Sequence, residues 1–89
     1  MDGQVSADER VIDMKEIDPR HRHLIAAQLF EHLPVGETLQ LVVDHNPKPL
    51  RFQFEAKYGA QCSWTFLEEG PDSWRVRLRK APIRETSDV

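Results

Sequence analysis

Two strand-to-helix junctions constrain the fold of this 89-residue chain more than any other feature. In each, a short run typical of a β-strand is followed by a polar residue and a proline, Asp18-Pro19 in one and Asn46-Pro47 in the other. Aspartate and asparagine side chains accept hydrogen bonds from the free amides at a helix start, and proline is favoured in the first turn. Each junction therefore predicts a helix that begins directly after a strand.

Apolar periodicity and turn signals place the other elements. We expect strands over residues 10–14, 38–43, 62–67 and 74–78, and helices over residues 19–33 and 47–58. Residues 69–72 (EGPD) predict a turn that joins the last two strands into a hairpin. The sequence therefore predicts one α+β domain over residues 10–81, a two-layer sandwich of order β-α-β-α-β-β with both helices on one face of a four-stranded mixed sheet. Residues 1–9 and 82–89 are expected to be flexible tails.

Parallel pairing of the first two strands would bring both helix starts to one edge of the sheet. Free backbone amides and the positive ends of both helix dipoles would meet there, which favours an anion. The candidate ligand-binding residues in the two loops are Arg20, Arg22, His23, Asp44, His45, Asn46, Lys48 and Arg51. The alternative is a solvated capping loop, in which the acidic and amide residues only cap the helices and the basic residues only face water.

The histidines leave two other functions open. His23 and His45 would suit a metal- or haem-binding redox accessory if the fold brought them together with Asp44. The chain has one cysteine and no pair of histidines at helical spacing, so we expect no bound metal and no cofactor. An enzyme acting on a small anion would use His23 or His45 for proton transfer and Arg22 or Lys48 to hold the anion. This last hypothesis has the least support, because no set of nucleophile, base and orienting group is visible.

Composition argues against several partners. The net charge of −3 and the pI of about 5.7 disfavour bulk attraction to nucleic acid or to an anionic membrane. No apolar run approaches the length of a membrane span, and the N-terminus lacks the regions of a signal peptide, so we expect a cytoplasmic protein. Arg75, Arg77 and Arg79 are expected to face solvent on the last strand, without the exposed aromatic residues that stack on RNA bases. The expected partner is a small anionic ligand or a protein, and the oligomeric state stays open.

Several short strings carry a resemblance to a known family. They are Ile12-Asp13, Arg22-His23, residues 34–37, residues 44–50 (DHNPKPL), residues 64–71 (WTFLEEGP) and residues 74–76 (WRV). On these strings the chain, from about Val11 to Lys80, resembles the bacterial domain-of-unknown-function family 2249. The resemblance implies a fold similar to that of TusA-type sulfur carriers and a link to redox or nitrogen-oxide metabolism. It supplies no catalytic residues.

One departure from the TusA-type carriers bears on function. Those carriers place a reactive cysteine before a proline at the start of the first helix, where the helix dipole lowers the pKa of the thiol. Here residues 17–20 hold no cysteine. The single cysteine, Cys62, alternates with Trp64 and Phe66 on the inward face of a later strand and is expected to be a buried core thiol. We therefore expect the fold without persulfide transfer.

Overall fold

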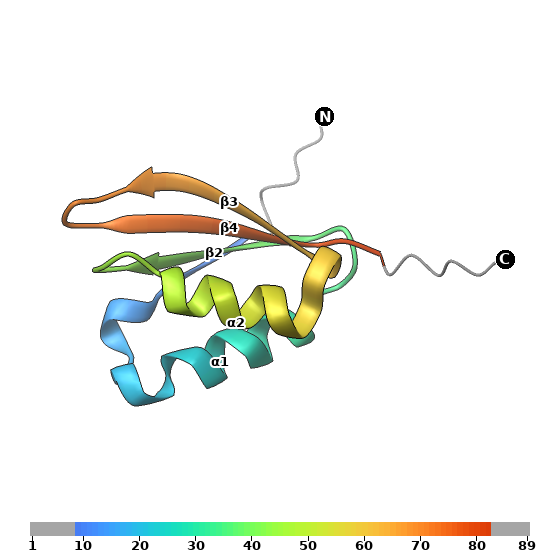
Figure 1. Cartoon of the computed structure of the whole chain (residues 1–89), viewed down its shortest axis with the longest axis horizontal. Coiled ribbons are helices and arrows are strands. Elements are labelled where there is room, and N and C mark those ends of the chain that lie inside the picture. The colour runs from blue at the N-terminus through green and yellow to red at the C-terminus, as the bar shows by residue number, and fades with distance from the viewer. Residues whose placement is uncertain (1–8, 83–89) are drawn as a thin grey trace, which may run out of the picture.

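The computed structural model describes residues 9–82, which form two helices against one face of a four-stranded sheet (Figure 1). In chain order the elements are β1 (Arg10–Asp13), the short 3₁₀ helix η2 (Met14–Glu16), α1 (Pro19–Glu31), β2 (Thr38–Val43), α2 (Lys48–Tyr58), the 3₁₀ turn η3 (Gly59–Gln61), β3 (Cys62–Glu69) and β4 (Trp74–Lys80). The predicted α+β sandwich is confirmed. The flexibility predicted for residues 1–8 and 83–89 lies outside the described residues.

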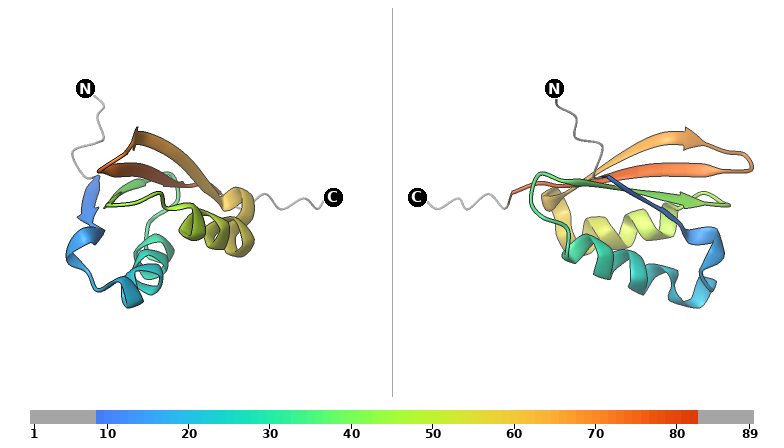
Figure 2. Two further views of the ribbon diagram at one scale, coloured as in Figure 1. Left: turned by 60° about the vertical axis from the view of Figure 1, so that its left-hand side comes forward. Right: turned by 180° about the vertical axis from the view of Figure 1, so that it is seen from behind.

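The sheet has the strand order β1-β2-β4-β3. β1 and β2 pair in parallel, with α1 as the crossover between them, whereas β4 is antiparallel to both β2 and β3. Views from the side and from behind show both helices on the same side of the sheet, with the other side uncovered (Figure 2). The mixed sheet, the parallel first pair and the terminal hairpin all agree with the sequence prediction.

The start of α1 is the one that the sequence predicts. Pro19 is its first residue, and the Asp18 carboxylate accepts a hydrogen bond of 2.9 Å from the backbone amide of Arg20. This bond satisfies one of the amides that have no partner within the helix. The helix ends after Glu31, two residues earlier than the apolar stripe suggested.

The start of α2 differs from the prediction. Asn46 does not cap the helix: Pro47 takes that position, and no side chain caps the first turn. Pro47 and Pro49 have no amide hydrogen, and the first helical hydrogen bond runs from the amide of Arg51 to the carbonyl of Pro47, at 3.0 Å. Two prolines therefore leave fewer amides for a capping side chain to bind, and Lys48 becomes the first helical residue.

The core lies between the helices and the sheet. Phe30 of α1 meets Phe54 and Tyr58 of α2 with ring centroids 5.5 and 4.7 Å apart. The buried residues of this cluster are Met14, Ala26, Phe30, Leu39, Leu41, Val43, Leu50, Phe54, Val76 and Leu78. Met14, predicted as the last residue of the first strand, instead opens η2, and its side chain is fully buried. Cys62 is only partly buried at the margin of this core, so the predicted burial of its thiol is incomplete.

A polar network crosses the uncovered face of the sheet. The guanidinium of Arg77 donates to both carboxylate oxygens of Glu9, at 2.7 and 3.0 Å, and Arg75 donates to the amide oxygen of Gln40 at 2.8 Å. Gln40 in turn donates to Glu9 at 2.8 Å. Glu9, assigned to the flexible tail by the sequence, has a side chain only 6% exposed. The three strand arginines lie on the uncovered face, as predicted, and two of them, Arg75 and Arg77, are also hydrogen-bonded to neighbouring side chains.

Candidate functional site

Both helices begin at the same edge of the sheet, where β1 and β2 end (Figure 1). Arg22, in the first turn of α1, links the two loops at this edge. Its guanidinium donates to the carbonyls of Ile17 and Lys15, at 2.8 and 3.4 Å, and to the Asp44 carboxylate at 3.5 Å. Its side chain is only 11% exposed. The shared edge that the two junctions predicted is therefore present. Arg22, which was predicted to bind a ligand there, is one of the residues that hold this edge together.

The polar groups at the start of α1 are bonded to one another. The guanidinium of Arg20 contacts the Asp18 carboxylate at 2.8 Å, and the same carboxylate accepts from the Arg20 backbone amide. These bonds from Arg20 hold the pKa of the Asp18 carboxyl below its usual value. The Arg20 side chain is 80% exposed, so this ion pair contributes little to stability. This half of the edge matches the solvated capping loop that the sequence left as the alternative.

Asp44 and His45 form a pair in the loop between β2 and α2. The Nδ1 atom of His45 lies 2.7 Å from the Asp44 carboxylate. Because a carboxylate only accepts, Nδ1 carries the hydrogen, which leaves Nε2 to accept a proton or to bind a ligand. The hydrogen bond from His45 and the charge of Arg22 hold the pKa of Asp44 below its usual value. Both side chains are at least half exposed.

His23 is directed elsewhere. Its Nδ1 atom lies 2.9 Å from the side-chain oxygen of Gln53 on α2, so it helps to join the two helices. His23 and His45 therefore have different partners. Within residues 9–82 no three histidine, cysteine or acidic side chains come close enough together to hold a metal ion. The two histidines that the sequence proposed for a metal or haem site are thus hydrogen-bonded to different side chains, Gln53 and Asp44.

Three of the predicted residues lie around the start of α2. Arg51 donates to Glu55 at 3.1 Å, and its guanidinium lies 5.9 Å from the centre of the Phe66 ring. Lys48 makes no ion pair with any described residue, and both Lys48 and Asn46 are exposed. Of the eight candidates, His45, Asn46 and Lys48 keep the most capacity to bind something outside the chain.

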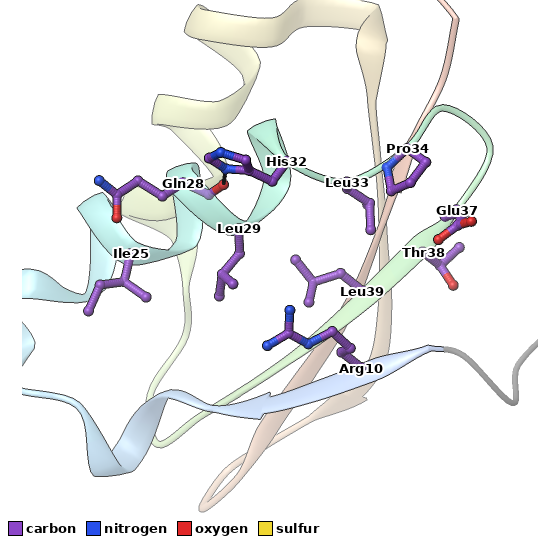
Figure 3. Close-up of a pocket in the computed structure, with 10 residues that line it drawn as sticks. All are labelled: Arg10, Ile25, Gln28, Leu29, His32, Leu33, Pro34, Glu37, Thr38 and Leu39. Carbon is purple, nitrogen blue, oxygen red and sulfur yellow. Dashed lines mark hydrogen bonds between the residues drawn. The ribbon is translucent and has the colours of Figure 1, made fainter.

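Sequence patterns did not predict a hollow of about 560 Å³ at the other end of α1 (Figure 3). Its apolar lining comes from α1, the loop that follows it and β2: Ile25, Leu29, Leu33, Pro34 and Leu39. Its polar lining consists of Arg10, Gln28, His32, Glu37 and Thr38. The one signal in the sequence was Arg10, a charged residue at an inward-facing position of β1.

Comparisons with known proteins identify a family and no function. Residues 11–80, most of the chain, match the family described as "Uncharacterized conserved protein (DUF2249)". Neither the curated proteins nor the solved structures include a significant match. The element order is the one that the resemblance to TusA-type carriers implies, while the likeness of the folds in detail stays a prediction. No helix in the described part of the chain has the length and apolar character needed to cross a membrane.

Proposed function

Because the chain belongs to the DUF2249 family, whose description assigns no activity, we propose from its geometry that it is a small non-enzymatic binding module. Its ligand is a small anion, or an acidic group of a protein partner, held where α2 begins. Cytoplasmic location and a role in redox or nitrogen-oxide metabolism, as the family resemblance implies, are part of this proposal. The observation that carries it is the uncapped start of α2 beside Lys48.

The start of α2 has backbone donors that the described part of the chain does not use. The amides of Lys48 and Leu50 precede the first helical hydrogen bond, and no side chain of residues 9–82 accepts from them. A helix start also carries a partial positive charge, which an anion stabilises by about 0.3–1 kcal/mol at an exposed site. The Lys48 ammonium adds a charge-assisted hydrogen bond. An anion at this point therefore gains from both groups without displacing an existing ion pair of Lys48.

The surroundings of this point are already fixed. Arg22 holds the loop before α1 against Asp44, and Asp44 orients His45. His45 follows Asp44 directly and lies two residues before Pro47, the residue at which α2 begins its hydrogen bonding. A preformed loop loses less conformational entropy on binding, which favours recognition by a short exposed segment. The exposure of His45 and Lys48 makes the contact weak and reversible, as expected of an accessory module.

The Asp44–His45 pair is the observation that favours a second candidate, an enzyme acting on a small anion. A carboxylate that binds Nδ1 of histidine is the usual way to orient Nε2 for proton transfer. No serine, threonine or cysteine of the described residues is hydrogen-bonded to His45, so the pair lacks a nucleophile to activate. A binding function therefore needs only the groups described at this site, whereas catalysis would also need a nucleophile.

Titration of the ¹⁵N-labelled protein with phosphate, and separately with a short acidic peptide, tests the binding proposal. We expect saturable shifts of the Lys48, Leu50 and Arg51 amides with at least one of the two. Lys48→Glu should abolish these shifts, while Arg79→Glu, an exposed arginine on the uncovered sheet face, should leave them intact. Stronger binding of the peptide would identify a protein partner, and stronger binding of phosphate a small anion. Equal losses in both variants would show general charge screening and would refute the proposal.

A further inference from the structure

The hollow at the far end of α1 is a candidate site of a different kind. We propose that it binds a small organic acid, one that carries a single carboxylate on an apolar body. The apolar body lies on the leucines of α1 and β2, and the carboxylate lies at Arg10. The inference does not depend on the proposed function. The hollow is lined by the last turns of α1, and the end of α1 lies at the opposite end of the helix layer from the start of α2 (Figure 1).

The size and lining of the hollow fit a small molecule. Its volume of about 560 Å³ falls within the range of roughly 300–1,000 Å³ that is typical of ligand sites. Leu39 at its floor is 1% exposed, and Leu29 and Leu33 are half-buried beside it. An apolar group placed over these side chains would leave water, which is favourable in proportion to the area covered.

Arg10 gives the hollow its charge. In the register of β1 and β2, Arg10 is opposite Leu39 and Ile12 is opposite Leu41, so both β1 residues lie on the face that the helices cover. Ile12 packs against the core, whereas the guanidinium of Arg10 points toward Leu29 and Leu39 at the side of the hollow (Figure 3). Arg10 forms no ion pair with the rest of residues 9–82. A guanidinium above an apolar surface is well matched to the carboxylate of a bound acid, which it can hold through two parallel hydrogen bonds.

The opposite rim favours a monoanion over a dianion. His32 donates from Nδ1 to the carbonyl of Gln28 at 2.8 Å, because a carbonyl can only accept. Its Nε2 is then available to a hydroxyl or amide of the ligand. Glu37, which also lines the hollow, adds a negative charge that repels a second anionic group. One guanidinium and one carboxylate thus flank an apolar floor, which suits an acid with one charge.

Octanoate is a suitable probe, with acetate and octan-1-ol as matched comparators. Acetate has the charge without the apolar body, and octan-1-ol has the apolar body without the charge. We expect octanoate to shift the amides of Leu29, Leu33 and Leu39 saturably, at concentrations well below those needed for either comparator. Octan-1-ol binding as tightly as octanoate would overturn the role of Arg10. Octanoate shifts on the uncovered sheet face or around Lys48, with none in the hollow, would overturn the site.

Two substitutions distinguish the contribution of the Arg10 charge from that of the shape of the hollow, and two others serve as controls. Arg10→Gln should weaken octanoate binding by about tenfold, the equivalent of one charge-assisted hydrogen bond, and should leave octan-1-ol binding unchanged. Arg79→Gln is the matched control and should bind octanoate as the parent protein does. Leu29→Trp should fill the hollow and remove binding of both compounds. Lys48→Glu should not affect octanoate binding, so this site and the proposed site at α2 can fail independently. Unchanged octanoate affinity in Arg10→Gln would refute the proposal.

Discussion

The guanidinium of Arg22 lies 3.5 Å from the Asp44 carboxylate and joins the loop before α1 to the loop before α2. The same guanidinium also donates to the backbone carbonyls of Ile17 and Lys15. Its side chain is almost fully enclosed by these contacts. An arginine that sequence analysis nominated as an anion clamp therefore holds together the edge at which the anion is expected.

Replacing this arginine tests that structural role. Arg22→Ala removes the Arg22 hydrogen bonds to two backbone carbonyls and to the Asp44 carboxylate, which keeps its bond from His45. We expect the free energy of unfolding to fall by roughly 1–3 kcal/mol. Urea denaturation followed by tryptophan fluorescence measures the change. The matched control is Arg20→Ala. The Arg20 side chain is 80% exposed and, within residues 9–82, is paired only with Asp18, so its removal should leave stability nearly unchanged. Equal effects of the two substitutions would contradict the assignment.

The Glu9–Arg77 ion pair predicts a loss of stability in acid. Hydrogen bonding from Arg77 lowers the pKa of the Glu9 carboxyl from 4.5 to about 2. Because the folded protein favours the charged form, this contribution is complete above pH 4.5 and disappears as the pH falls toward 2. We expect Glu9→Gln to show a shallower loss of stability over this range than the parent protein. Glu69→Gln, on an exposed carboxylate of β3, should follow the parent curve.

Cys62 should react slowly in the native protein. Burial raises the pKa of its thiol to about 11, so very little thiolate is present at neutral pH. We expect a disulfide reagent at pH 8 to label the native protein far more slowly than the urea-unfolded protein. The native rate should rise with pH toward 11, since the thiolate is the reacting form. Rapid labelling of the folded protein at pH 8 would reopen a thiol-based function.

The indole ring of Trp74 leaves no room for a side chain at Gly70. Its φ is +52°, and a methyl group there would lie 2.7 Å from two ring carbons. Gly59 has a nearly equal φ of +56°, with no atom within 4 Å of an added methyl group. Both alanine variants bear the backbone strain, of order 1–3 kcal/mol, but only Gly70→Ala also forces the ring to move. Thermal unfolding should therefore show the larger loss for Gly70→Ala, and equal losses would refute the steric part.

The fold was accessible from the sequence because its signals are local. Asp18 and Pro19 mark the start of α1, and alternation through Leu39, Leu41 and Val43 marks β2 and its buried face. The cap of α2 was predicted wrongly, because the two prolines there change which amides exist to be capped. Which amides lack a partner depends on where the first turn of α2 forms its hydrogen bond. The preference of single residues for capping positions does not determine that point.

The candidate site was predictable in place but not in detail. Strand order brings Arg22 near Asp44, and residue types alone indicated a charged edge. The two carbonyl partners of Arg22 depend on the 3₁₀ turn that follows β1, which no pattern predicted. The hollow was missed for a related reason: its shape depends on how the last turns of α1 lie over β1 and β2, which is a property of packing.

The first strand has an unusual attachment for its length. β1 has four residues and one neighbour, β2, which is the arrangement most prone to local opening in a sheet. Yet Glu9 binds Arg77 at one end of it, and Met14 is fully buried in the core at the other. Opening β1 thus requires breaking an ion pair and unpacking the interior. We therefore expect its amide hydrogens to exchange with solvent together with those of the central strands, so that the sheet behaves as one cooperative unit out to this edge.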